Sequence, residues 1–256
     1  MVKPSTLASS LIPDMTALPL PAHVNDIEPR PYAALPRPGD SSHPHWDNLS
    51  WMRYIIPLDD QGRTSFCALY TACNALEAAY RAGGQVIPPQ TQIDAHRVGL
   101  LGCEMYGADR IDKGFTRPEA WSVIQAAGLV KSATMHQCVT EQDETEGMSE
   151  APLLCGFAIN HRWDYPNPDN GYIDPISGSP VTTGYHAVVQ VGELYRGPHV
   201  YELYATSWVP YGWHSLLMMH RTAARQTQIY DGKYAIHFGV GEREGYDGWR
   251  KWLVHR

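Results

Sequence analysis

The sequence predicts an α+β fold, in which a helical half precedes a half built from antiparallel strands. Residues 64–81 carry Ala, Leu and aromatic side chains at spacings of three and four, the period of a helix with a buried face. Beyond residue 150 the chain consists of short β-prone runs separated by Gly, Pro and Asn. Helices and strands do not alternate, so we expect two packed halves with a cleft between them.

The helices are expected in the first half, over residues 64–81, 90–101 and 117–127. The first should end at Gly83, and the last should begin after Thr116, a suitable N-cap ahead of Pro118, and end at Gly128. The strands of the second half are expected over residues 153–159, 186–191, 200–207, 215–219 and 233–238.

Residues 1–45 are rich in Pro, Ser and Ala and are predicted to form an extended arm, because Pro obstructs helices and central strands alike. The arm holds His43 and His45, but two His fall short of a zinc pattern, so no metal and no other cofactor is predicted. The main folded domain should follow over residues 46–256, with its helical half at about 46–150 and its β half at about 151–256.

The composition argues against several classes of partner. With 256 residues, 43% hydrophobic and 18% charged, the chain should be a folded, soluble protein. A formal net charge of -7 provides no basic field for nucleic acid or anionic lipid. No segment approaches the roughly 18 consecutive apolar residues of a membrane-spanning helix. Neither nucleic acid nor a membrane is therefore expected as a partner.

Cysteine usage and the N-terminus bear on location. Five cysteines leave at least one thiol unpaired within the chain, which favours a reducing compartment. The apolar pair Leu11-Ile12 is interrupted at Pro13, so no secretory signal is predicted. A cytoplasmic location is the expectation.

Cys67 is the candidate nucleophile. It stands near the start of the best predicted helix, where the helix dipole stabilises a thiolate. Gln61, six residues upstream, could donate from its side-chain amide to an oxyanion. A buried, chemically idle Cys67 is the alternative, and Cys73, Cys103, Cys138 and Cys155 are expected to be idle thiols of that kind.

His186 is the best of twelve His residues to act as the base for this thiol. It stands at the entry to the apolar strand predicted over residues 186–191, which would hold the imidazole at the rim of a cleft. The run Thr206-Ser207-Trp208 follows twenty residues later. A strand-end His bonded only to backbone is the alternative.

The order of these segments resembles the papain-like cysteine peptidases, from about Pro57 to Trp213. The resemblance implies a papain-like fold, with Gln61 and the Cys67 backbone N–H as oxyanion donors. His186 would hold the thiol as a thiolate and later protonate the leaving amine. Thr206 aligns with the Asn that orients the imidazole in that family, and Trp208 with the Trp that shields their hydrogen bond.

The sequence departs from the family at several positions. A Thr206 hydroxyl can accept a hydrogen bond from an imidazole N–H, but it is shorter than an amide. Thr64 stands where the family has a disulfide-forming Cys, and Ala68 where it has Trp. No inhibitory pro-segment is recognisable ahead of the catalytic region.

Four residues beside the expected catalytic groups are predicted to contact the substrate: Ser65, Phe66, Tyr185 and Trp208. The aromatic-rich segment 160–183 is expected to be a loop that either walls the cleft or simply packs. The identity of the substrate and the oligomeric state stay open.

Three functions fit the sequence. The first is a thiol-dependent hydrolase, a cysteine peptidase or amidase that cleaves a peptide or a small amide through a Cys67 acyl-enzyme. The second is an acyltransferase or amide-forming enzyme of a biosynthetic pathway, which passes the acyl group to an amine or thiol. The third is a non-catalytic binding module that retains the cleft, and the unusual Thr206 favours it.

Overall fold

The structure is a computed structural model that describes the chain in separate ranges. They are Trp51, Tyr54, Trp163, Pro166 and residues 60–82, 91–160, 172–173, 182–196, 199–208, 215–239 and 253–255. The predicted N-terminal arm with His43 and His45 lies outside these ranges, as do Trp213 and most of the loop 160–183.

The helices within these ranges are α2 (Cys67–Ala82), α3 (Ala95–Tyr106), α4 (Arg110–Lys113), α5 (Arg117–Ala126), α6 (Glu141–Glu150) and α7 (Arg221–Thr227). The strands are β1 (Thr91–Ile93), β2 (Thr134–Gln137), β3 (Leu153–Ile159), β4 (Tyr172–Ile173), β5 (Gly184–Arg196), β6 (His199–Ala205), β7 (Leu216–His220), β8 (Gln228–His237) and β9 (Leu253–His255).

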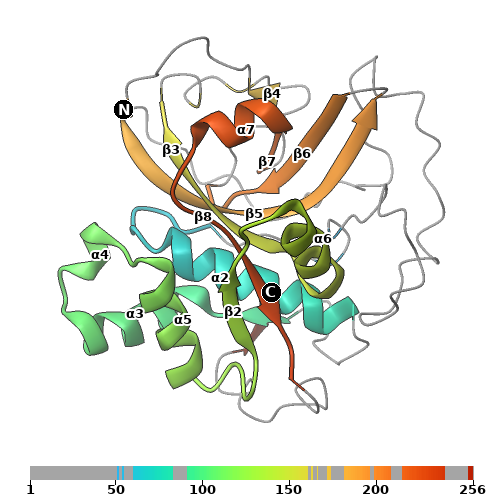
Figure 1. Ribbon diagram of the computed structural model, residues 1–256. Helices are drawn as coiled ribbons and strands as arrows, with labels where there is room; N and C mark the ends of the chain where they lie inside the picture. The colour runs from blue at the N-terminus through green and yellow to red at the C-terminus, as the bar shows by residue number, and fades with distance from the viewer. Residues whose placement is uncertain are drawn as a thin grey trace.

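The larger sheet has seven strands in the order β2-β8-β3-β5-β6-β7-β4, and β1 pairs separately with β9. Neighbouring strands are antiparallel except for β4 and β7. In Figure 1 the helices α2, α3, α4 and α5 lie in the lower half of the view, alongside β2, while α7 lies in the upper half, near β7. The predicted α+β class is confirmed.

α2 is the central helix, and its small side chains explain its position. Every residue from Ala68 to Tyr80 is buried, so the helix is covered on all sides rather than on one face. Ala at many of these positions lets neighbouring elements approach closely. α2 packs against β5 and β3, which fixes its N-terminus against the sheet.

The helix predicted over residues 117–127 is confirmed as α5, with its N-cap. The Thr116 hydroxyl accepts the N–H of Glu119, whose carboxylate in return accepts the N–H of Thr116 at 2.9 Å. The helix predicted over residues 90–101 is wrong at its start, because residues 91–93 pair with β9 as β1. α3 begins after Asp94, whose side chain accepts the N–H of Arg97 at 2.9 Å.

Helices cover both faces of the larger sheet. The guanidinium of Arg117, from α5, lies against Gly156 of β3. Cys155, next along β3, points to the opposite face and is paired with Lys233 of β8, which bonds Glu144 of α6. α5 and α6 therefore lie on opposite faces, and the β strands between them form the shared layer.

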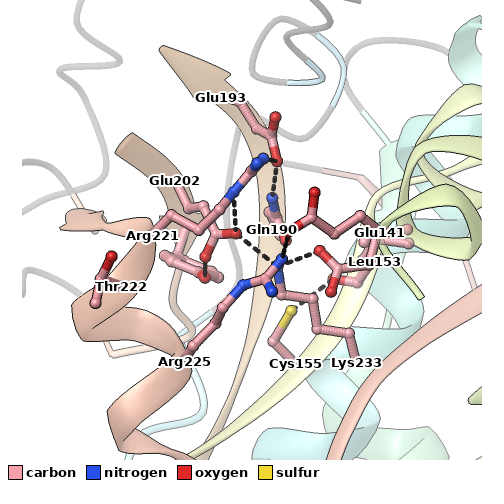
Figure 2. Close-up of polar contacts among 12 residues, drawn as sticks. Glu141, Leu153, Cys155, Gln190, Glu193, Glu202, Arg221, Thr222, Arg225 and Lys233 are labelled. Carbon is pink, nitrogen blue, oxygen red and sulfur yellow. Dashed lines mark hydrogen bonds and ion pairs between the residues drawn. The ribbon is translucent and has the colours of Figure 1, made fainter. Parts of the chain in front are cut away.

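A buried ionic cluster fills the face under α6 and α7 (Figure 2). Lys233 donates at 2.7 Å to both Glu144 and Glu202, and its side chain is 1% exposed. Glu202 also accepts the hydroxyl of Tyr204, and Arg221 of α7 lies 3.4 Å from it. Burial alone would lower the pKa of Lys233, but the carboxylates, Glu202 first, hold that pKa above its ordinary value.

Candidate active site

Cys67 is the first residue of α2 and is half-buried. The main-chain N–H groups of Ala187, Ala68 and Cys67 itself hydrogen-bond toward its sulfur and favour the thiolate. Burial of the thiol outweighs them and raises the pKa of Cys67 above its ordinary value. Because Ala187 follows His186 on β5, the sulfur lies beside the strand position that carries the imidazole.

His186 is held between two partners from the same segment. Its Nε2 lies 2.7 Å from the hydroxyl of the fully buried Thr206. The indole of Trp208 stacks on the imidazole, with ring centroids 3.6 Å apart and planes 14° from parallel. When Nε2 carries the proton and donates it to Thr206, the Nδ1 lone pair is left to act as a base.

The environment of His186 keeps it neutral. The side chain is 2% exposed, and burial lowers the pKa of His186 to about 3. Burial thus disfavours a charge on the thiol and on the imidazole alike. A proton that passes from one to the other creates both charges together, and their attraction offsets part of that cost.

The side-chain amide of Gln61 is held at both ends. Its Nε2 donates to the Thr64 carbonyl at 2.8 Å, and its Oε1 accepts the hydroxyl of Ser207 at 2.5 Å. The backbone N–H of Gln61 also donates to the Ser207 carbonyl at 3.0 Å. The bond to Thr64 uses one of the two Nε2 hydrogens, so the amide keeps a second one for an oxyanion.

The turn between Gln61 and Cys67 depends on glycine. Gly62 has φ +57, a left-handed conformation that side chains rarely adopt, and its N–H donates to Asp60 at 2.9 Å. The hydroxyl of Thr64 then donates to the Gln61 carbonyl at 2.8 Å, which closes the turn. Thr64, which stands where the papain-like cysteine peptidases have a disulfide-forming Cys, thus closes the turn with its hydroxyl.

The four expected substrate contacts differ in what they can reach. Tyr185 is 62% exposed and offers its ring to solvent, whereas Trp208 is occupied by its stack on His186. Ser65 donates its hydroxyl to the carbonyl of Asp112 at 2.7 Å.

Phe66 corrects the expectation. Its side chain is fully buried against the rings of His96 and Phe115, so it has no surface for a substrate. Consecutive residues at a helix start point in different directions, and here the apolar one faces the core while Cys67 faces β5.

Two residues near the site were not singled out from the sequence. Ser207 stands in the quoted run Thr206-Ser207-Trp208, but nothing in that run shows that its hydroxyl reaches Gln61. Arg117 follows a predicted N-cap, a position that gives no sign of a buried cation.

Among the described residues, no group of three or more His, Cys, Asp or Glu side chains is placed to hold a metal ion. Within the same ranges, every helix is too short or too polar to cross a membrane.

No protein-family model and no curated protein sequence matches the chain. Its structure is similar to xylellain, a cysteine protease from Xylella fastidiosa, with a TM-score of 0.58 and 15% identity over 72% of this chain and 85% of that one. It is similar to the bromelain protease from Ananas comosus, solved with the E64 inhibitor, with a TM-score of 0.57 and 16% identity over 75% and 99%. Digestive procathepsin L 3 of Tenebrio molitor gives a TM-score of 0.59 and 15% identity over 77% and 72%. The chain has the papain-like fold.

Proposed function

We propose that this protein is a thiol-dependent hydrolase that cleaves a peptide or a small amide through an acyl-enzyme on Cys67. The observation that carries the proposal is the bond of 2.7 Å between His186 Nε2 and Thr206, stacked under Trp208. This bond orients the imidazole of His186. The next residue, Ala187, directs its backbone N–H toward the Cys67 sulfur. Cysteine proteases among the structural neighbours are consistent with this chemistry.

The reaction begins with the neutral pair. Cys67 Sγ attacks the substrate carbonyl carbon, and the thiol proton passes to His186 Nδ1. The carbonyl π electrons move to its oxygen, which accepts hydrogen bonds from the Gln61 amide and the Cys67 backbone N–H. Because the C–S bond and the imidazolium form together, no stable thiolate is needed beforehand.

Collapse of this intermediate releases the amine. The C–N bond breaks, the proton on Nδ1 goes to the departing nitrogen, and the acyl group stays on sulfur. Water then attacks the thioester while His186 accepts its proton. The C–S bond breaks, the proton returns to sulfur, and a carboxylic acid leaves.

A non-catalytic binding module is the second candidate, and one observation favours it. Burial raises the pKa of Cys67, so the isolated thiol holds its proton more firmly than a free cysteine does. Such a thiol would react slowly with alkylating agents at neutral pH. The two candidates therefore differ in the reactivity of one sulfur.

Labelling of Cys67 distinguishes the two candidates. Brief treatment with iodoacetamide or an epoxide at pH 7, followed by peptide mapping, should place one label on Cys67. The label should vanish in Cys67→Ala, weaken in His186→Ala and persist in the matched control Cys103→Ala, which removes another partly exposed thiol. Equal labelling of all accessible cysteines would reject the hydrolase.

Hydrolysis and acyl transfer share the first half-reaction, so the acceptor needs its own experiment. A peptide substrate should be incubated with the protein and an added amine, and the products weighed by mass spectrometry. Hydrolysed product alone at high amine concentration supports the hydrolase. A dominant amide product would instead assign the protein as an acyltransferase.

A further inference from the structure

Tyr204 of β6 lies on the same face of the larger sheet as the imidazole of His186. Tyr204 is opposed to Gln190 of β5, and directly opposed residues of antiparallel strands share a face. Gln190 and His186 are four residues apart on β5, which pairs with β3 without interruption between them, so both point to that face. Thr206, the partner of the imidazole, follows Tyr204 by two residues.

The ring of Tyr204 contacts the strand on the other side of β5. Its centre lies 5.0 Å from that of Phe157 of β3, with the two planes at 86°, an edge-to-face pair. Phe157 is opposed to His186, so the phenyl ring and the imidazole stand beside each other on this face. Trp163 covers Phe157, with ring centres 5.4 Å apart. These four side chains are at most 2% exposed, so a shift of one ring displaces its neighbours.

The hydroxyl of Tyr204 fixes the far end of this ring. It donates to Glu202, which also accepts from Lys233 at 2.7 Å within the buried ionic cluster (Figure 2). Burial, and after it the charge of Glu202, holds the pKa of Tyr204 well above its ordinary value, so the phenol keeps its proton and stays a donor. A phenylalanine would fill the same space but leave the carboxylate one donor short.

We propose that Tyr204 is a positioning residue that holds the imidazole of His186 in its bond to Thr206. It acts through Phe157, which stands beside the imidazole, and through the strand that leads into Thr206. The inference rests on the proposed function and deepens it, because it identifies what keeps the base oriented from behind the site. Tyr204 needs no contact with substrate for this role.

The orientation of the imidazole leaves little room for error. Its Nε2 must stay 2.7 Å from the Thr206 hydroxyl while Nδ1 takes the thiol proton in the proposed mechanism. A rotation that breaks the first contact also turns the base away from that proton. A misplacement of about 1 Å caused far from the chemistry can cost about a hundredfold in rate. A fraction of that shift at Phe157 is therefore measurable.

The test compares substitutions of two buried tyrosines. Y204F keeps the ring and removes the hydroxyl, and Y204L removes the ring as well. Y80F is the matched control, because Tyr80 is buried near the end of α2 remote from Cys67 and packs edge-on against Phe238. With one peptide substrate, kcat should fall about threefold in Y204F and about thirtyfold in Y204L, with KM unchanged. Y80F should keep the parent kcat, even where its melting temperature falls.

Nuclear magnetic resonance of protein labelled with 15N-histidine gives a readout that does not need activity. The Nε2 proton of His186, held in the bond to Thr206, should give a downfield signal in the parent, and His186→Asn identifies it by its loss. The signal should shift or broaden in Y204F and Y204L and stay in place in Y80F. A role of Tyr204 in stability alone would lower the melting temperature and leave the signal of the folded protein unchanged.

In a protein that cleaves peptide, the inference requires both the loss of kcat and the change in the His186 signal, and either one without the other would overturn it. Equal losses of kcat in Y204F and Y80F would overturn it too, because they would assign the effect to core stability. Circular dichroism checks that each variant is folded, and Y204F alone decides if Y204L does not fold.

The outcome is separable from the fate of the proposed function. A shifted His186 signal in Y204F of a protein that cleaves nothing keeps the role of Tyr204 and rejects the hydrolase. Cleavage through Cys67 with an unchanged kcat and an unchanged signal in Y204F keeps the hydrolase and rejects the role of Tyr204.

Discussion

The hydroxyl of Ser207 donates to the side-chain oxygen of Gln61 at 2.5 Å, across 146 residues of sequence. This bond joins the turn ahead of the nucleophile to the segment that orients the imidazole. A second bond, from the Gln61 N–H to the Ser207 carbonyl at 3.0 Å, runs alongside it. The proposed oxyanion donor and the His partner Thr206 are thereby fixed relative to each other.

Removal of the Ser207 hydroxyl should slow catalysis without removing any reacting group. In Ser207→Ala the Gln61 amide loses the bond that fixes its oxygen, so kcat for peptide cleavage should fall about tenfold. Gln61→Ala should lose about a hundredfold or more, because an oxyanion donor is removed outright. The double variant should match Gln61→Ala alone, and Ser207→Thr should restore activity. Additive losses would show that Ser207 acts independently of Gln61.

Thr206 should matter through its hydroxyl rather than its shape. Thr206→Val keeps the branched side chain but cannot bond His186, so the imidazole loses its orientation and kcat should fall about tenfold or more. Thr206→Ser keeps the hydroxyl and serves as the matched control. Steady-state kinetics with one peptide substrate would measure both. Equal loss in the Val and Ser variants would mean that packing under Trp208 matters instead.

His186 should make the protein less stable in mild acid. Burial lowers the pKa of His186 to about 3, so the imidazole is protonated in the unfolded chain below about pH 6.5 but stays neutral in the folded protein. Above pH 6.5 the imidazole is neutral in both states and the free energy of unfolding is at its full value. It falls as the pH drops from 6.5 toward about 3, where the folded protein also takes up the proton. Between pH 7 and pH 4 this amounts to about 3 kcal/mol of unfolding free energy.

Urea unfolding at several pH values measures this loss. In His186→Asn, which does not titrate, the slope of stability against pH over the same window should become shallower. Parallel curves for the two proteins would contradict the buried neutral imidazole.

Lys233 should be essential to stability because it neutralises the fully buried carboxylate of Glu202 and the partly buried one of Glu144. In Lys233→Met, Glu144 and Glu202 lose a partner 2.7 Å away, and the variant should be destabilised by about 3–5 kcal/mol. The double variant Lys233→Met with Glu202→Gln should recover part of this loss, since one unpaired charge is gone. Chemical denaturation gives the four values of the cycle. If the double variant is as unstable as Lys233→Met alone, the loss of stability comes from packing and not from the unpaired charge.

The predictable parts of the fold are those with a local cause. α2 was predicted over residues 64–81 from the spacing of its small and apolar side chains, and it forms over Cys67–Ala82. The N-cap Thr116 was readable because a capping box needs only neighbours in sequence. α6 (Glu141–Glu150) was not predicted, because its polar sequence shows no apolar period. Its signals are a capping box at Thr140 and the ion pair of Glu144 with Lys233, 89 residues away.

The same division holds in the site. Gln61, Cys67, His186 and Thr206 could be named from the sequence because short segments occur in a recognisable order. The bond of Ser207 to Gln61 and the approach of Arg117 to Gly156 could not, because they depend on how distant strands pair. The direction of a side chain was equally out of reach, and Phe66, placed at the substrate, belongs to the core.

The buried ring of Phe66 ties the position of Cys67 to the packing of the core. The ring packs against Phe115 and against Gly99 of α3, where a β carbon would come within 2.2 Å of it. Cys67 is its covalent neighbour, so a displacement of the ring is transmitted through one peptide unit to the sulfur. Mutations such as Gly99→Ala, in the core and away from the candidate site, should therefore change the reactivity of Cys67 and the melting temperature together, so that a substitution made to stabilise this core also moves the sulfur.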